Sequence, residues 1–238
     1  MIHDVIEELK KIKARGFIPS RRDRSTGVGY TLECELGIEE NNLSDPDIDG
    51  TVELKAKRAG SSSRITGFCL EPIKVMGDRK LIEKYGYQPE DPTRFDAYYD
   101  LKVDQRCAHG FILRLEKLKY ANKTRTCLVI RDVSDKRIAH WPLSVLEFKF
   151  QTKYSNLLLV TAERKREKGI EYFHYNDAVL CTDITEEKIA ELFQKGDLII
   201  GTRMWMNKHT GKVRNHGTCV RGSKESTLSL FANVKKVL

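Results

Sequence analysis

The order of the predicted strands is the feature that most limits what this chain can fold into. Between residues 96 and 182 strand patterns follow one another, with one predicted helix, at 143–152, among them. A doubly wound sheet needs a helix between most neighbouring strands, so this order excludes that architecture and predicts a mixed α+β fold. The strands are expected at 96–103, 111–116, 126–130, 137–141, 157–161 and 171–175.

The remaining elements follow from apolar spacing and turn residues. Apolar residues recur at helical spacing from Ile2 to Ile12, and Gly16 stands where a C-cap glycine is expected, which predicts a helix over 3–14. Thr185 begins a capping-box pattern for a helix that ends near Gly196. Further helices are expected at 28–37 and 78–85, further strands at 51–57, 64–70, 197–206 and 218–221, and a turn at 60–63 between the first two of these strands.

Composition narrows the class of protein. The chain has 238 residues, of which 40% are hydrophobic, so it can bury the core of one large domain or of two apposed lobes. No apolar run approaches the roughly 18 residues of a membrane span, and acids stand where a signal peptide has a basic region. We therefore expect a cytoplasmic protein without a membrane partner. The net charge of +8 suits nucleic acid but does not identify it.

The cysteines argue against two common uses of that residue. Six cysteines are scattered along the chain without a C-x-x-C pair, so neither a zinc ribbon nor a disulfide framework is expected. We expect the cysteines to be reduced thiols. Cys107 and His109 have no second pair at ligand spacing, which argues against zinc chemistry.

The segment 46–55, Pro-Asp-Ile-Asp-Gly-Thr-Val-Glu-Leu-Lys, carries a pattern with chemical meaning. Side chains alternate along a strand, so Glu53 and Lys55 share one face while Val52 and Leu54 point into the core. An aspartate shortly upstream can bring a second carboxylate beside Glu53. Two carboxylates form a hard oxygen site for Mg²⁺, and the adjacent ammonium group can orient or help to activate an attacking water. The pattern indicates metal-assisted hydrolysis of phosphodiesters.

Several assignments stay open at the level of the sequence. The same Glu-x-Lys triplet also occurs on solvated strand faces that pair across strands. Asp47 is our choice for the second carboxylate, and Asp49 competes with it, depending on the turn at Gly50. Lys57 extends the same face and would bind phosphate or be merely solvated. Glu33 is a candidate third carboxylate that orients water or holds a second ion.

Residues 19–29 form a basic loop of small residues, with arginines at 21, 22 and 24. Such loops offer guanidinium groups, hydroxyls and free backbone amides, all of which suit phosphates. Arg21 and Arg22 are therefore candidate contacts to a nucleic-acid backbone. A solvated surface loop is the competing interpretation.

Beyond single motifs, the chain resembles the MvaI/BcnI family of type II restriction endonucleases, relatives of the mismatch-repair nicking enzyme MutH in the PD-(D/E)XK nuclease superfamily. The resemblance covers nearly the whole length, with several motifs in the same order at compatible spacings. These motifs are Thr26–Gly29 with Glu33, Glu40–Leu43 before Pro46-Asp47, Glu53–Lys55, Ala162-Glu163, Tyr172–Asn176, Thr182–Thr185, Gly196-Asp197 and His216–Thr218 with Arg221.

The resemblance implies the mixed-sheet nuclease core of that superfamily and a set of catalytic roles. Asp47 and Glu53 would bind the metal, Lys55 would be catalytic and Glu33 would support them. The implied cofactor is Mg²⁺, for which Mn²⁺ would substitute. Residues 1–120 would form mainly the catalytic lobe and 121–238 mainly the recognition lobe, partly interleaved, with a DNA-binding cleft formed by the two.

The resemblance also places residues in or near the DNA grooves. Arginine can bridge guanine O6 and N7, asparagine can pair with adenine, and histidine can contact acceptors or phosphates. For Arg214 and His209, a basic hairpin that touches phosphates alone is an equal alternative. The candidate DNA-contacting residues are Arg21, Arg22, Thr66, Cys69, Arg203, Arg214, Asn215, His216 and Arg221.

The chain departs from the family pattern at recognition positions. Relatives carry His-Asp-His-Gly or His-Asp-Arg-Gly where this chain has residues 214–217, and an acid where it has Gly201. One relative places a base-reading histidine where this chain has Cys69, after the matching Thr66. A CC-N-GG-like pentanucleotide is therefore only the default expectation for the target.

Together these features predict a type II restriction endonuclease that cuts the two strands of duplex DNA in turn as a monomer. A cognate DNA methyltransferase is expected in the same cell but not as a bound subunit. One alternative is a MutH-like nicking enzyme recruited by a mismatch-repair partner, although no long partner-binding extension is apparent. The other is a nuclease-fold DNA-binding protein without catalysis, which the presence of Asp47, Glu53 and Lys55 disfavours.

Overall fold

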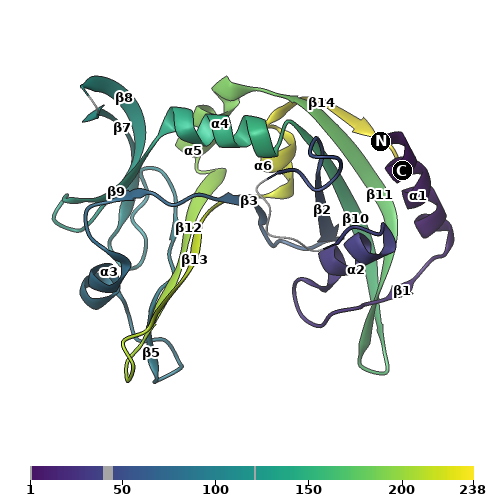
Figure 1. The fold of residues 1–238 in the computed structure, drawn as a ribbon, viewed down its shortest axis with the longest axis horizontal. Coiled ribbons are helices and arrows are strands. Elements are labelled where there is room, and N and C mark those ends of the chain that lie inside the picture. Colours follow the sequence, from purple (N-terminus) through teal and green to yellow (C-terminus); the bar gives the residue numbers. More distant parts are fainter. Residues whose placement is uncertain (1, 40–44, 121) are drawn as a thin grey trace. The chain divides into compact units, whose positions relative to one another are not determined.

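The structure, a computed structural model, describes residues 2–39, 45–120 and 122–238 (Figure 1). The chain divides into two compact units, each assembled from separated segments. Unit 1 comprises residues 1–65, 149–185 and 227–238, and unit 2 comprises residues 66–148 and 186–226. The units alternate along the chain and neither begins or ends near residue 120, while the assignment of a catalytic and a recognition lobe stays a prediction.

Unit 1 is built on a mixed five-stranded sheet of order β1-β11-β10-β2, with β14 also paired to β11. β2 lies parallel to β10, and β10 forms an antiparallel hairpin with β11. Its elements are α1 (Ile2–Ala14), β1 (Ile18–Pro19), α2 (Gly27–Glu35), β2 (Glu53–Arg58), β10 (Asn156–Glu167), β11 (Ile170–Ile184) and β14 (Phe231–Lys236).

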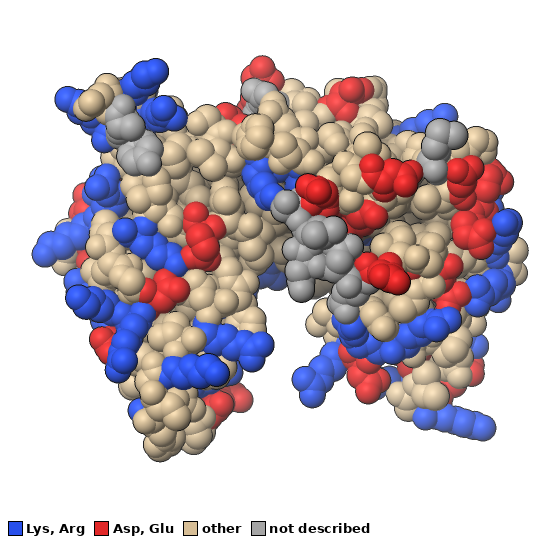
Figure 2. All heavy atoms as spheres, viewed as in Figure 1, with Lys and Arg blue, Asp and Glu red and all other residues tan. Residues whose placement is uncertain are grey.

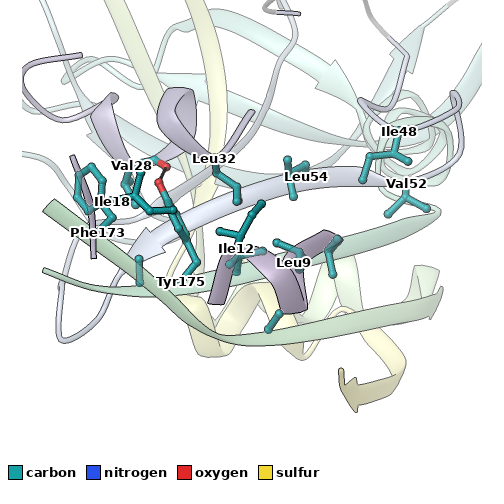
Figure 3. Packing of buried hydrophobic residues seen from close by; sticks show 14 residues of the cluster. Leu9, Ile12, Ile18, Val28, Leu32, Ile48, Val52, Leu54, Phe173 and Tyr175 are labelled. Carbon is teal, nitrogen blue, oxygen red and sulfur yellow. Dashed lines mark hydrogen bonds between the residues drawn. The ribbon is translucent and has the colours of Figure 1, made fainter. Parts of the chain in front are cut away.

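The core of unit 1 brings α1, α2, β2 and β11 together. Figure 3 shows Leu9 and Ile12 of α1, Leu32 of α2 and Leu54 of β2 pointing toward one another. Each such buried side chain contributes about 1.5–3 kcal/mol relative to exposure. In the same cluster the Tyr175 hydroxyl donates a hydrogen bond of 2.8 Å to a backbone carbonyl of α2. Packing of Leu54 fixes β2, the strand that carries Glu53 and Lys55.

Unit 2 contains two sheets. One has the order β3-β13-β12-β5 with β6 also paired to β12, and the other has the order β4-β9-β8-β7. The helix α4 (Leu143–Lys153) runs from unit 2 into unit 1, and α6 (Lys224–Leu228) lies at the last boundary along the chain, between residues 226 and 227. The other elements are β3 (Ile65–Cys69), β4 (Ile73–Lys74), α3 (Asp78–Tyr85), β5 (Arg94–Ala97), β6 (Asp100–Leu101), β7 (Ile112–Tyr120), β8 (Lys123–Arg131), β9 (Arg137–Pro142), α5 (Glu186–Lys195), β12 (Leu198–Asn207) and β13 (Val213–Gly222).

The predicted mixed α+β class is confirmed, but three local expectations are wrong. The strands at 51–57 and 64–70 do not form a hairpin across residues 60–63, because β2 pairs with β10 and β3 belongs to the sheet of β13. The strand expected at 96–103 is broken into β5 and β6. Cys69 and Cys219 are joined in a disulfide instead of being thiols, since β3 and β13 are neighbouring strands.

Among the residues that the structure describes, no helix is both long and apolar enough to span a membrane.

Candidate functional site

Asp47, Glu53 and Lys55 come together where the turn at 47–51 enters β2. The backbone N–H of Leu54 donates to Asp47 Oδ2 at 2.9 Å, which holds that carboxylate against the strand. The Lys55 ammonium group forms an ion pair with Glu53 and lies 3.9 Å from Asp47 Oδ2. The three side chains chosen from the sequence therefore form one cluster in unit 1.

The structure favours Asp47 over Asp49 as the second carboxylate. Asp49 is exposed and adopts a left-handed backbone with φ of 50°, next to Gly50 with φ of 63°. That turn leaves Asp47 to make the bond to Leu54 and the approach to Lys55. The backbone conformation of the turn thus distinguishes Asp47 from Asp49, the two residues between which the sequence did not decide.

Glu53 is more deeply buried than its strand pattern predicts. Its side chain is 1% exposed, so it does not stand at an open surface. Burial raises the pKa of the Glu53 carboxyl above its ordinary value, and the Asp47 carboxylate acts in the same direction, while Lys55 and Lys153 act in the opposite one. A desolvated carboxylate beside a second one has a strong demand for positive charge, which a divalent cation can meet.

Lys153, at the C-terminal end of α4, is a member of this cluster that the sequence analysis missed. Its Nζ lies 3.0 Å from Glu53 Oε2 and donates a 2.9 Å hydrogen bond to the carbonyl of Asp45. The next residue, Tyr154, is fully buried, and burial raises the pKa of its phenol well above the ordinary value, with Glu53 and Asp47 adding to the shift. Parallel pairing of β10 with β2 brings this segment to the site.

Lys57 is buried and is not the solvated residue that was one of the two expectations. It is 8% exposed, and its ammonium group donates to the carbonyl of Ser63. Glu33 lies half-buried on α2, with Oε1 3.8 Å from where a Cβ on Gly29 would be. Its supporting role stays a prediction. The motif Glu40–Leu43 lies outside the described residues.

The basic loop 20–26 is tied to β2 and β11 of unit 1. The Arg58 guanidinium pairs with Glu171 at 2.7 Å and donates to the carbonyls of Arg24 and Ser25 at 3.0 and 2.8 Å. Ser20 N–H donates to the carbonyl of Glu171 at 2.8 Å. These contacts fix both ends of the loop, and Arg58 and Glu171 were not identified from the sequence.

The candidate phosphate contacts in this loop differ in how they are held. Arg21 donates to Glu35 at 2.8 and 3.0 Å, in a cluster that Arg15 shares. Arg22 stacks its guanidinium 3.6 Å from the centre of the Tyr30 ring. Arg21 is therefore engaged with a carboxylate, and Arg22 lies against an aromatic ring.

Seven candidate DNA contacts outside the basic loop lie on one sheet of unit 2, and His209 lies in the turn between β12 and β13 of that sheet. Thr66 and Cys69 are on β3, Arg203 is on β12, and Arg214, Asn215, His216 and Arg221 are on β13. Thr202 pairs with Thr218 and Met204 pairs with Asn215. Two residues of β13, His216 and Gly217, therefore lie opposite the single residue Arg203 of β12, which is a β-bulge. Gly217 has φ of 89°, as such a bulge requires. The bulge sets Arg203 opposite His216.

The side chains on this sheet are not equally available. Arg214 and His216 are exposed, and so is Thr66. Asn215 donates to Asp78 at 2.9 Å and to Glu71 at 3.2 Å, and its oxygen accepts from Gly217 N–H, so it supports the strand end instead of presenting a free amide. Cys69 is committed to the disulfide with Cys219.

Charged side chains are distributed differently on the two units (Figure 2). In the view shown, basic side chains gather near the tip of the β12–β13 hairpin and β5 in unit 2, and acidic ones are frequent over the part of unit 1 that carries β2. Among the described residues no group of three or more His, Cys, Asp and Glu side chains is arranged to hold a metal. Any ion at Asp47 and Glu53 would thus have two protein carboxylates and further ligands from solvent or substrate, as Mg²⁺ commonly does.

Comparison with known proteins identifies the family of this chain. The model of the MvaI/BcnI restriction endonuclease family matches residues 6–231, nearly the whole chain. The chain belongs to the MvaI/BcnI restriction endonuclease family. As a member it is an enzyme, a site-specific endonuclease acting on DNA. No curated protein matches it.

Solved structures agree on the fold of this restriction endonuclease. It is similar to restriction endonuclease MvaI in a complex with its cognate DNA substrate, with 24% sequence identity and a TM-score of 0.82 over 99% of this chain and 98% of that one. It is also similar to MvaI in the absence of DNA, with 23% identity and a TM-score of 0.57 over 100% of this chain and 97% of that one.

Proposed function

We propose that this restriction endonuclease is a type II enzyme that hydrolyses phosphodiester bonds of double-stranded DNA with Mg²⁺ held by Asp47 and Glu53. The observation that carries the proposal is the cluster of two carboxylates and two ammonium groups at β2. Its donors are hard carboxylate oxygens, which suit Mg²⁺ and Mn²⁺, whereas zinc sites usually include nitrogen or sulfur ligands. Mg²⁺ held there supplies Lewis-acid polarisation of the scissile phosphate.

The residues of the chain have separate tasks in this proposal. Lys55 is 28% exposed, so its ammonium group can reach both solvent and substrate, orient the attacking water and stabilise charge that develops on the phosphate. Lys153 is 13% exposed and lies on the opposite carboxylate oxygen of Glu53. We assign it the task of holding Glu53 in its orientation as a positioning residue.

DNA binding is proposed to use the sheet of β3, β13, β12 and β5 for bases and the loop 20–26 for phosphates. MvaI, which has the same fold, was solved in a complex with its cognate DNA substrate, and this supports a DNA-binding role for the shared fold. By the stated resemblance, the target is a CC-N-GG-like site that a monomer cuts one strand at a time. A cytoplasmic location and a separate cognate methyltransferase stay predictions.

Digestion of a sequenced plasmid tests the function directly. With Mg²⁺, wild-type protein should first nick and then linearise the plasmid, and the mapped ends should share one short sequence. A protein purified in parallel with Glu53→Gln, and a reaction with EDTA, control for contaminating nucleases. Nicks that never become double-strand breaks would favour the nicking alternative, and intact plasmid with both Mg²⁺ and Mn²⁺ would contradict the proposal.

Replacing Lys153 with methionine should lower the cleavage rate by about 10–100-fold, because partners that orient a metal ligand contribute effects of this size. Methionine keeps the length of the side chain and removes the charge beside Glu53. The measurement is single-turnover cleavage over a range of Mg²⁺ concentrations, and a positioning role predicts a higher Mg²⁺ requirement. Lys149→Met, one turn earlier on α4, is the control. A loss of rate with an unchanged Mg²⁺ requirement would contradict the positioning role.

Replacing Arg203 and replacing Arg22 should affect DNA binding in different ways. Arg203→Ala should cost about 1–3 kcal/mol on the cognate site and little on scrambled DNA, since a base contact is lost. Arg22→Ala should weaken both and reduce the salt dependence by about one unit of slope. Titrations of both duplexes at several salt concentrations, with Ca²⁺ in place of Mg²⁺, measure this. Equal losses on both duplexes for Arg203→Ala would make Arg203 a phosphate contact.

A further inference from the structure

Two of the candidate base-contacting arginines share a carboxylate that no sequence motif indicated. Arg203 of β12 donates to Asp100 Oδ1 at 2.7 Å, and Arg221 of β13 approaches the two Asp100 oxygens at 3.3 and 3.4 Å. Asp100 belongs to β6, on the same sheet. The three side chains are 23–48% exposed, so the group lies at the surface and solvent reaches it.

A glycine leaves the space that this group occupies. Gly201 pairs with Asp100 in the register of β12 and β6. A Cβ on Gly201 would lie 3.1 Å from Asp100 Oδ1, 3.2 Å from Arg221 Cδ and 3.3 Å from Arg203 Nη1. Any side chain at this position would press on all three partners. The backbone is therefore shaped around the carboxylate and the two guanidinium groups.

The combination of charges points to base edges and not to phosphates. A phosphate contact gains nothing from a carboxylate beside the arginines, because the carboxylate repels it. In the major groove, guanine offers two acceptors, O6 and N7, and its partner cytosine offers a donor, the N4 amino group. Two guanidinium donors with a carboxylate acceptor between them match that pattern for G·C pairs.

We propose that Asp100 is a specificity-determining residue whose carboxylate accepts a hydrogen bond from the N4 amino group of a cytosine, next to guanines bound by Arg203 and Arg221. The inference rests on the proposed function, since it needs this sheet to lie in the major groove. Arg203 and Arg221 both contact Asp100 Oδ1, at 2.7 and 3.3 Å, whereas Asp100 Oδ2 has only the longer contact of 3.4 Å to Arg221, so Oδ2 is the oxygen that we assign to the base. In the absence of DNA, the same contacts hold the arginines in place.

A double-mutant cycle between the protein and the base separates base reading from simple support of the arginines. The target site is first selected by wild-type protein from randomised duplexes with Ca²⁺. Each cytosine of the selected site is then replaced with 2-pyrimidinone, which lacks the 4-amino group. Dissociation constants of wild type and Asp100→Ala are measured on each duplex at one salt concentration.

At one cytosine, the analogue should weaken wild-type binding about 10-fold or more, as expected for one lost base contact. Asp100→Ala should bind the natural site correspondingly weakly and lose nothing further with the analogue there. Asp104→Ala should keep the full effect of the analogue. If Asp100→Ala does not fold, Asp100→Asn replaces it: with its oxygen on Arg203 it turns an N–H toward the base, so removal of the amino group should not weaken its binding.

Two results would overturn the inference, and they can be told apart. If the analogue weakens wild type and Asp100→Ala equally at every cytosine, Asp100 only supports the arginines, and the proposed function stands without it. If wild-type protein selects no sequence from the pool, the proposed function fails and this inference fails with it.

Discussion

Replacing Glu53 with glutamine is expected to reduce DNA cleavage by about 10³-fold or more, which corresponds to about 4 kcal/mol of transition-state stabilisation. Glutamine keeps the volume of the side chain but removes the charge that a divalent cation requires. Glu53 is almost fully buried between Lys55 and Lys153, so its charge is held in a fixed place that the neutral amide cannot serve. Single-turnover cleavage of a cognate duplex measures the loss, and the thermal unfolding midpoint shows whether the protein is folded.

The neighbouring aspartates provide a matched comparison. Asp47→Asn should be as inactive as Glu53→Gln, because it removes the other carboxylate of the pair. Asp49→Asn should cleave like wild type, since asparagine is favourable at φ of 50° and it is Asp47 that accepts from Leu54 N–H and lies 3.9 Å from the Lys55 ammonium group. An inactive Asp49→Asn beside an active Asp47→Asn would show that the turn rearranges on binding DNA and that the assignment of the carboxylates is wrong.

The sequence predicted part of this site because the relevant residues are close along the chain. Asp47, Glu53 and Lys55 lie within one turn and one strand, and the alternation of side chains places the last two on one face. The burial of Glu53 and the presence of Lys153 depend on the parallel pairing of β2 with β10, about a hundred residues later. No local pattern encodes that pairing, so Lys153 could not be found in the same way.

The same distinction explains the errors in the fold. Helices such as α1 and α3 were located because their apolar spacing is local. The partner of β3 is β13, near the other end of the chain, and a turn-like sequence at 60–63 suggested a hairpin instead. That pairing also brings Cys69 and Cys219 together across 150 residues, which the spacing of cysteines does not reveal.

At the proposed DNA interface, the sequence identified residue types but not their partners. Asn215 has the chemistry to pair with adenine, yet its amide is used by Asp78 and Glu71. The missing acid at Gly201 looked like a loss of recognition, whereas the structure places Asp100 3.1 Å from the position of its absent Cβ. Both outcomes depend on strands that are distant in sequence and adjacent in the sheet.

Replacing Lys55 with methionine is expected to reduce cleavage by about 10²–10³-fold while Ca²⁺-dependent binding of the cognate duplex is retained. Methionine preserves the stem of the side chain and removes the ammonium group that pairs with Glu53 and lies 3.9 Å from Asp47 Oδ2. Lys55→Arg should also be impaired, because a planar guanidinium group cannot occupy the place of a compact ammonium group between two carboxylates. Rates are measured at saturating Mg²⁺, so that weakened metal binding does not account for the loss.

Lys57 provides the decisive comparison because it lies two residues along the same strand and is also a lysine. Its ammonium group is buried and bound to the carbonyl of Ser63, so Lys57→Met should lower the thermal unfolding midpoint and leave the rate per folded molecule nearly unchanged. Lys55→Met should do the reverse, since its partners are the carboxylates of the site. If both variants lost the same fraction of the rate per folded molecule, the charge of β2 as a whole, and not the position of Lys55, would be what cleavage requires.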